Sequence, residues 1–199
     1  MKSILVQGAE AIIRKNKELI IKDRIKKSYR LPQLDDKLRR QRTKREAKLL
    51  EKASKLIPVP RVSKTNEYQI ELELIKGKKL SESLDKLKNN KKICEQIGKN
   101  IAILHDANII HGDLTTSNMI SSKNKVYFID FGLGFESSKV EDKAVDLHLI
   151  KEAVEARHYK HFSSFFEAVI NGYKTSKQSK EVLKRLETVE KRGRYKAQY

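Results

Sequence analysis

Asp113, Asn118 and Asp130 have the side-chain types and the spacing that chemistry on a phosphate group requires. Phosphoryl transfer asks little covalent chemistry of a protein and depends mainly on positioning and on neutralising the charge of the transferred group. Asp113 can orient an attacking hydroxyl or water, or accept its proton. Asn118 and Asp130 offer the hard oxygen ligands that suit Mg²⁺ held by few protein groups and by phosphates. The pattern predicts Asp113 as a catalytic residue and Asn118 and Asp130 as metal ligands.

The order of the motifs that carry these residues narrows the chemistry further. The segment His111–Asn118 reads His-Gly-Asp-Leu-Thr-Thr-Ser-Asn, and Asp130-Phe131-Gly132 begins twelve residues later. This is the order of the protein-kinase signature, His-x-Asp-x-x-x-x-Asn and then Asp-Phe-Gly. An apolar strand over residues 126–129 directs the following carboxylate into a cleft. A polar turn with buried aspartates capping helices explains neither the order nor the spacing. We therefore expect a protein that binds ATP with Mg²⁺ and acts on its γ-phosphate.

A lysine and a glutamate upstream complete the expected phosphate-binding set. Lys22 follows the apolar residues Leu19–Ile21, at the place of the strand lysine that reaches the α- and β-phosphates. Glu46 lies in a predicted helix, on the side facing the cleft, where it can hold the lysine. An unpaired lysine would be poorly positioned. Arg24 and Lys26 are alternatives to Lys22, which is preferred because three apolar residues form the strand before it.

The remaining nucleotide contacts are expected from two backbone segments. Glu73, Leu74 and Ile75 precede Gly77 and are predicted to form a hinge whose backbone hydrogen-bonds adenine. Gly8 lies in a short loop, residues 7–11, at the place of the glycine-rich loop that covers the phosphates. Gly8, Glu73 and Ile75 therefore join Lys22 and Glu46 as predicted nucleotide-binding residues.

These residues must be positioned by a small sheet and a set of helices. Strands are expected at residues 4–6, 11–13, 19–22, 61–64 and 68–75, and a helix at 34–55 that ends before two prolines. Helical spacing of apolar residues predicts a second helix over 91–107. Two short strands flank a turn at 121–124, and the chain beyond Asp142 is expected to be helical, with breaks near Ser163 and Gly172.

The predicted fold class is α+β: a minimal bilobal protein-kinase-like fold. We expect a β-rich N-terminal lobe over 1–76, with a small antiparallel sheet and one helix. A reduced helical lobe is expected over 77–199, and the two lobes form one kinase-like domain.

Composition restricts the setting and the partners. The 199 residues carry a formal net charge of +18, and residues 14–52 contain sixteen Lys or Arg against six Asp or Glu. The excess charge fits either a solvated lysine-rich surface or contact with a polyanion, RNA before membrane. The single cysteine, Cys94, cannot form an internal disulfide and is expected to be an unreactive packing residue. No apolar run reaches the length of a membrane helix, so a cytoplasmic protein is expected.

Three departures separate the chain from an ordinary protein kinase. The loop at residues 7–11 keeps one glycine, Gly112 stands where an arginine normally precedes the catalytic aspartate, and only nine residues separate Gly132 from Asp142. The platform that docks peptide substrates is therefore expected to be largely missing.

With these departures the chain resembles the small kinase-like subunit of the KEOPS/EKC complex, the p53-related protein kinase family. The resemblance is carried by Gly8–Ala11, Lys26–Asp35, Arg42–Ala47, His111–Asn118, Asp130–Gly134 and Arg192–Arg194. The Tyr-Arg-x-Pro-x-Leu-Asp pattern within Lys26–Asp35 is more discriminating than the kinase motifs. Family members often continue the basic run after Arg-Gly-Arg, whereas here Tyr195 interrupts it.

The resemblance implies ATP hydrolysis or autophosphorylation that serves a partner. That partner would be a threonylcarbamoyl-transferase subunit, which modifies an adenosine beside the anticodon of certain tRNAs. A second, small subunit would dock on the β lobe. The basic stretches then acquire tRNA as their expected ligand.

Other functions remain open on the sequence. A small-molecule phosphotransferase of the aminoglycoside or choline kinase type also uses His-Gly-Asp and a later Asp, but such enzymes usually carry a helical substrate lobe that this chain is too short to include. The Asp-Phe-Gly and Tyr-Arg-x-Pro motifs speak against a RIO-type kinase. A catalytically silent RNA-binding scaffold would not need all of Lys22, Glu46, Asp113, Asn118 and Asp130.

Overall fold

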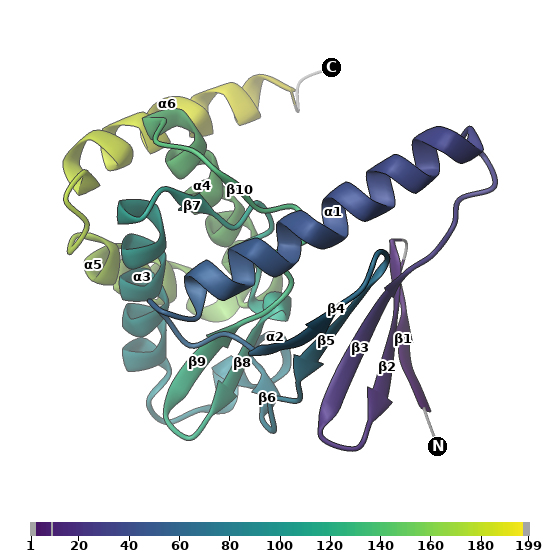
Figure 1. The fold of residues 1–199 in the computed structure, drawn as a ribbon. Coiled ribbons are helices and arrows are strands. Elements are labelled where there is room, and N and C mark those ends of the chain that lie inside the picture. The colour runs from purple at the N-terminus through teal and green to yellow at the C-terminus, as the bar shows by residue number, and fades with distance from the viewer. Residues whose placement is uncertain (1–2, 9, 197–199) are drawn as a thin grey trace.

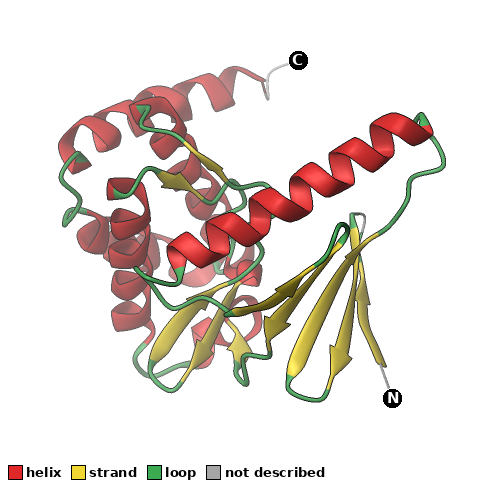
Figure 2. Ribbon diagram, viewed as in Figure 1, coloured by secondary structure: helices red, strands yellow, loops and turns green. Residues whose placement is uncertain are grey.

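The structure, a computed structural model, describes residues 3–8 and 10–196 of the chain. A five-stranded antiparallel sheet and a long helix make up its first part, and helices with two small sheets make up the rest (Figure 1). Figure 2 shows the five-stranded sheet on one side of the molecule and most helices on the other, with a small two-stranded sheet among the helices. Within the described residues, no helix has the length and apolarity needed to span a membrane.

The N-terminal sheet places Lys22 near its centre. Its strand order is β1-β2-β3-β5-β4, and all neighbours are antiparallel. The strands are β1 (Ser3–Gln7), β2 (Ala11–Asn16), β3 (Leu19–Arg24), β4 (Val62–Thr65) and β5 (Gln69–Glu73). Lys22 lies opposite Ile13 on one side and Ile70 on the other. All five expected strands are present, with ends shifted by a few residues.

Helix α1 (Pro32–Ala53) runs diagonally past the sheet toward the helical part of the molecule (Figure 1). Pro32 occupies the first helical turn, where its missing N–H leaves no hydrogen bond unmade. The expected helix is confirmed, but it ends at Ala53, before the prolines are reached. The chain leaves the helix there because Ile57 and Val59 are drawn into the core, each 5% exposed. A turn, in which the amide of Ile57 donates to the carbonyl of Ala53 at 2.9 Å, makes this possible.

The second part of the chain contains the expected helices and short strands. Its elements are β6 (Lys78–Lys79), α2 (Leu80–Ser83), α3 (Asn90–Asp106), β7 (Ile109–Ile110), β8 (Met119–Ser122), β9 (Lys125–Phe128), β10 (Phe135–Glu136), α4 (Val140–Arg157), α5 (Phe162–Tyr173) and α6 (Ser179–Lys196). Short 3₁₀ turns lie at Leu84–Lys86, Thr116–Asn118 and Tyr159–His161. Strands β6, β8 and β9 form one small sheet, and β7 and β10 form the other.

The expected breaks near Ser163 and Gly172 are present within a few residues, although Gly172 itself is inside α5, at its C-terminal end. A Cβ on Gly172 would lie 2.0 Å from the carbonyl oxygen of Glu95 in α3. A Cβ on Gly98 would likewise lie 1.9 Å from the carbonyl oxygen of Val169 in α5. The two glycines therefore allow the backbones of α3 and α5 to touch. Ser163 is also inside α5, and the actual interruptions lie at residues 158–161 and 174–178.

One contiguous hydrophobic cluster joins the sheet and the helices. It includes Leu49 of α1, Ile70 of β5, Ile97 of α3 and Leu147 of α4. Burial raises the pKa of the Cys94 thiol, within this cluster, to about 12, so Cys94 is the unreactive packing residue expected. The proposed lobe boundary after residue 76 falls in the segment between β5 and β6.

Candidate nucleotide site

The predicted contact between Lys22 and Glu46 is present. Strand β3 carries Lys22 inward, and its Nζ lies 2.7 Å from Oε1 of Glu46 on α1. Glu46 is 1% exposed and Lys22 is 7% exposed. A charge buried this deeply needs a partner of opposite sign, so the two residues hold each other between the sheet and α1.

Asp130 joins this pair from the helical side. Its Oδ1 lies 2.6 Å from Lys22 Nζ and accepts a hydrogen bond from the amide of Gly132 at 3.1 Å. Burial alone would raise the pKa of Asp130, but the Lys22 ammonium and the Gly132 amide outweigh it and hold that pKa below its ordinary value. Asp130 also has φ +64°, a left-handed conformation that is strained for a side-chain-bearing residue and typical of functional sites.

Asp113 and Asn118 form a second cluster on the segment His111–Asn118, which we call the catalytic loop after its place in the kinase signature. The Asn118 side-chain amide donates to the Asp113 carboxylate at 2.8 Å and to the Asp113 carbonyl at 3.0 Å. Because both bonds use the Nδ2 donor, the polar atom of Asn118 that remains is Oδ1, the type of oxygen that binds Mg²⁺. The carbonyl of Asn118 accepts from the amide of Ile129, the residue before Asp130. The two predicted metal ligands are therefore joined through the backbone.

Asp146 fixes the catalytic loop through hydrogen bonds to its backbone. This 1% exposed carboxylate of α4 accepts from the amides of His111 at 2.8 Å and Gly112 at 2.9 Å, and contacts His105 Nε2 at 3.3 Å. Asp146 therefore anchors the backbone of this loop. Gly112 has φ +77°, and a Cβ there would lie 2.6 Å from the carbonyl oxygen of Leu133. An arginine would clash at this position, which explains its absence.

His111, as a neutral group, links the catalytic loop to Ile129, the residue before Asp130. Burial lowers the pKa of His111, which outweighs the opposite effect of Asp146. The neutral ring can donate from Nε2 to the Ile129 carbonyl at 3.1 Å and accept from the Asp113 amide at Nδ1, 3.3 Å away. Its ring also packs 4.5 Å from that of Phe131. The structure thus gives His111 the packing and hydrogen-bonding role expected of it, and His105 a similar one against Tyr173.

The other predicted nucleotide-binding residues lie apart from these clusters. Gly8 is exposed and donates to the carbonyl of Ala11 at 3.0 Å, which closes the turn between β1 and β2. Glu73 ends β5 and its carboxylate lies 3.4 Å from the amide of Arg61, while Ile75 follows in the connecting segment. Among the described residues, no hydrogen bond or ion pair links Gly8, Glu73 or Ile75 to Lys22 or Asp130. Their contacts with a nucleotide stay predictions.

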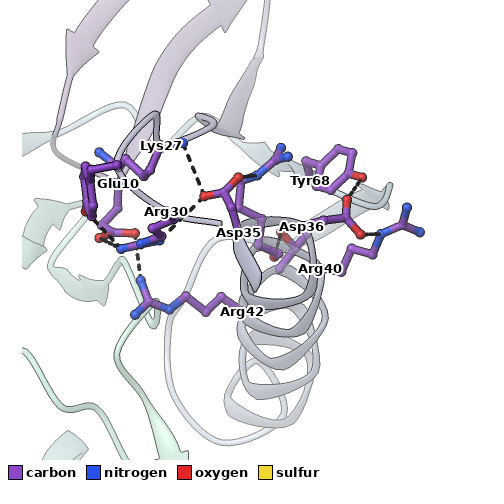
Figure 3. A network of polar contacts seen from close by, with 11 residues as sticks. Glu10, Lys27, Arg30, Asp35, Asp36, Arg40, Arg42 and Tyr68 are labelled. Carbon is purple, nitrogen blue, oxygen red and sulfur yellow. Dashed lines mark hydrogen bonds and ion pairs between the residues drawn. The ribbon is translucent and has the colours of Figure 1, made fainter. Parts of the chain in front are cut away.

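A polar network holds the short loop before β2 against α1 (Figure 3). Glu10 contacts Arg42 at 2.7 Å and Arg30 at 3.5 Å. Arg30 also reaches Asp35, a fully buried carboxylate that accepts from the Lys27 amide at 3.2 Å and from Arg39 at 2.7 Å. Sequence reasoning missed the roles of Glu10 and Asp35, although both lie in segments that carry the family resemblance. Ion pairs thus fix a loop that glycines make flexible in ordinary kinases.

The donor set fits Mg²⁺ shared with phosphates rather than a metal held by protein alone. Within the described part of the chain, no group of three or more His, Cys, Asp or Glu side chains could hold a metal ion. One carboxylate from Asp130 and one amide oxygen from Asn118 leave most of an octahedral shell to phosphates and water, as Mg²⁺ prefers.

Comparison with known proteins agrees with this geometry. The family model of the RIO domain matches residues 13–145. The KEOPS complex subunit Bud32 of Pyrococcus abyssi is 45% identical over 187 residues, which cover 90% of this chain and 85% of that protein. A probable bifunctional tRNA threonylcarbamoyladenosine biosynthesis protein of Methanosphaera stadtmanae is 40% identical, and the match covers 97% of this chain and 37% of that protein.

A solved structure confirms the fold class. The complex of the Rio2 kinase of Chaetomium thermophilum with ADP, Mg²⁺ and phosphoaspartate superposes with a TM-score of 0.62 at 16% identity, covering 98% of this chain and 70% of that one. The Asp-Phe-Gly and Tyr-Arg-x-Pro motifs were expected to speak against a RIO-type kinase, but the RIO-domain model matches a stretch that contains Lys22, Asp113 and Asp130, which corrects that expectation. The chain belongs to the RIO-domain family and, through its nearly full-length relatives, to the Bud32 family of protein-kinase-like proteins.

Proposed function

We propose that this chain binds ATP with Mg²⁺ and cleaves or transfers the γ-phosphate as a KEOPS-type subunit that supports threonylcarbamoyladenosine modification of tRNA. The observation that carries the proposal is the assembled pair of clusters: Lys22–Glu46–Asp130 on one side and Asp113–Asn118 on the other. A protein that had lost phosphate chemistry would have no need to keep two lysine-bound carboxylates, one of them on the strained residue Asp130.

Each residue has a defined part in the proposed reaction. Asp113 orients the attacking hydroxyl or water and accepts its proton. Asn118 and Asp130 would hold Mg²⁺, which would supply neutralisation of phosphate charge. Lys22 holds the α- and β-phosphates, Glu46 holds Lys22, and the backbone of residues 73–75 receives adenine.

Lys22 and Asp130 form an ion pair of 2.6 Å, so the predicted phosphate-binding and metal-binding groups neutralise each other. In the proposed reaction Lys22 would turn to the anionic phosphates and Asp130 would hold Mg²⁺. Either ligand alone would leave one charge of the pair without its partner. The expected consequence is that ATP and Mg²⁺ each bind more tightly in the presence of the other.

The proposed partners follow from the relatives and from the charge. The bifunctional relatives carry a matching region within a longer protein, which supports a threonylcarbamoyl-transferase partner. A second small subunit would dock on the β lobe. Basic surfaces would meet tRNA in the cytoplasm, including the open pocket lined by Lys26, Lys27, Ser28, Arg30 and Pro32.

The test is ATP turnover by the purified chain, alone and with a transferase subunit and tRNA. Asp113→Ala should cut turnover by about 10² to 10⁴ without changing the circular-dichroism spectrum or the melting temperature. Asp23→Ala is the matched control, because Asp23 pairs with Arg14 elsewhere on the sheet and should leave turnover unchanged. Turnover that ignores Asp113, or is absent under every condition, would refute the proposed activity.

Binding to tRNA is tested separately through its salt dependence. If basic side chains neutralise phosphates, the logarithm of the affinity should fall linearly with the logarithm of salt concentration, by roughly 0.7 to 0.9 for each phosphate contacted. The double variant Lys26→Gln, Lys27→Gln should reduce the magnitude of that slope by about twice the value for one phosphate contact. An unchanged slope would remove this pocket from the tRNA surface.

A further inference from the structure

Arg24 lies beside Lys22 in the phosphate-binding cluster, although kinase chemistry as outlined above has no role for it. Residues two apart in a strand point to the same face of the sheet, so β3 sends both cations inward. Arg24 is opposite Ala11, at the base of the loop predicted to cover the phosphates, and is 5% exposed. Its backbone amide donates to the carbonyl of Tyr68 at 2.9 Å, which fixes its place at the end of the strand.

Lys22 and Arg24 each contact a different oxygen of the same carboxylate, that of Glu46. Arg24 Nη2 lies 2.5 Å from Oε2 of Glu46, while Lys22 Nζ lies 2.7 Å from Oε1. Within residues 3–8 and 10–196, Glu46 is the one ion-pair partner of the Arg24 guanidinium. That bond uses a single nitrogen of a group with five N–H donors. Arg24 therefore has donors to spare beside the phosphate-binding lysine.

Arg24 also lies close to the segment Asp130–Gly132, which carries a predicted metal ligand. A Cβ on Gly132 would lie 2.9 Å from Asp130 Oδ1, 3.3 Å from Lys22 Nζ and 3.4 Å from Arg24 Nη2. All three charged groups thus converge on the backbone of one residue. Together with Glu46 they form a cluster of two positive and two negative charges, with no net charge.

Binding of nucleotide and Mg²⁺ would disturb the charge balance of this cluster. If Lys22 turns to the phosphates and Asp130 to Mg²⁺, Glu46 loses much of the neutralisation that its 1% exposure requires. Removing one partner from a buried ion pair is strongly destabilising. Arg24 has no other described ion-pair partner to leave for, so it can stay on Glu46 throughout.

We propose that Arg24 is a positioning residue that keeps Glu46 in the site while Lys22 and Asp130 separate, and that its charge makes the loaded site receptive to the anionic nucleotide. This inference rests on the proposed function, since it requires that ATP and Mg²⁺ bind here.

The charge of Arg24 makes a prediction that simple loosening of the structure does not. Replacing it by a neutral residue leaves the cluster with a net charge of −1. Affinity for an anion should fall and affinity for a cation should rise, because the same electrostatic change acts on them with opposite sign. A variant that was merely loosened would lose affinity for both.

The experiment compares Arg24→Gln, Arg24→Lys and the control Arg14→Gln with the unaltered chain. Arg14 lies on β2 in a 3.7 Å pair with Asp23, a partly exposed contact. Calorimetry measures the affinity for ATP with EDTA and for Mn²⁺ alone, and turnover is measured with MgATP. In Arg24→Gln we expect affinity for ATP to fall on the order of tenfold and affinity for Mn²⁺ to rise a few-fold. Arg14→Gln should change neither.

Arg24→Lys separates charge from geometry. Lysine keeps the charge but not the planar fork. The affinities for ATP and Mn²⁺ should therefore return to within a few-fold of those of the unaltered chain, while kcat with MgATP should be lower than in the unaltered chain. If Arg24→Gln does not fold, Arg24→Lys alone decides, and an unchanged kcat overturns the inference. Parallel losses of ATP and Mn²⁺ affinity, or no change in either, also overturn it. An unaltered chain that binds neither ATP nor Mn²⁺, even when both are supplied together, refutes the proposed function and this inference with it.

Discussion

The catalytic loop and the loop before β2 are both predicted parts of the nucleotide site, but different interactions hold them. The catalytic loop is bound to Asp146, which is 1% exposed and accepts hydrogen bonds from two backbone amides. The loop before β2 is held through Glu10, whose side chain is 45% exposed and pairs with Arg42 and Arg30 (Figure 3). Buried hydrogen bonds to a charge are strong, whereas exposed ion pairs contribute little and weaken with salt. We therefore expect the catalytic loop to be rigid and the loop before β2 to be adjustable.

The largest effect should come from Asp146→Ala. It leaves the amides of His111 and Gly112 without partners in a buried place, at a cost of about 3–5 kcal/mol in the free energy of unfolding. Urea denaturation measures the loss. Glu152→Ala, an exposed residue of the same helix, is the control and should cost less than about 1 kcal/mol. Equal losses for the two variants would show that the catalytic loop is not fixed through Asp146.

Glycine substitutions compare the two loops directly. Gly112→Ala forces a side chain into a left-handed conformation and against the Leu133 carbonyl, so it should destabilise the chain by about 2–3 kcal/mol. Gly8→Ala meets only the Ala11 carbonyl at 3.5 Å, an ordinary contact, and should cost less than about 1 kcal/mol. If Gly8→Ala proves the more damaging of the two by thermal denaturation, the contrast between the loops fails.

Acid should weaken the catalytic-loop side through His111. Its pKa is lowered from an ordinary 6.5 by burial, so the unfolded chain binds the proton more readily than the folded one. Stability is therefore complete above pH 6.5 and falls as pH drops below that value, by up to about 1.4 kcal/mol per pH unit. Urea denaturation between pH 7.5 and 5.5 gives the slope. His111→Gln should flatten it, and an undiminished slope in that variant would place the titration elsewhere.

The smallest effect is expected from Glu10→Gln. Because the pair with Arg42 is exposed, its loss should change stability by less than about 1 kcal/mol. The Michaelis constant for ATP should nevertheless respond, since the loop is released from α1. High salt should reproduce the effect in the unaltered chain and add little in the variant. A Michaelis constant that is insensitive to both would show that the loop is held by something other than these pairs.

Sequence reasoning worked where a motif fixes both residue type and order. The spacing within His111–Asn118 and the later Asp-Phe-Gly singled out Asp113, Asn118 and Asp130 as residues of one site. The strand of Leu19–Ile21 gave Lys22 and its contact with Glu46. These features are local in sequence or belong to a recurring pattern, so they can be inferred without coordinates.

Other features depend on contacts that no single segment encodes. Gly172 marked the end of a helix in the sequence, but its close backbone approach to Glu95 depends on the path of α3 and could not be predicted. Arg24 was only an alternative to Lys22, because nothing in the sequence shows that Glu46 offers one oxygen to each. The role of Glu10 was missed because Arg30 and Arg42 are brought to it only when α1 crosses the sheet.

The central claim, that Asp130 and Asp113 divide metal binding and catalysis between them, is tested most directly by calorimetry of MgATP with Asp130→Asn and Asp113→Asn. The account predicts that Asp130→Asn abolishes Mg²⁺-dependent ATP binding, whereas Asp113→Asn binds MgATP with near-normal affinity and loses only turnover. Normal MgATP affinity in Asp130→Asn would contradict it.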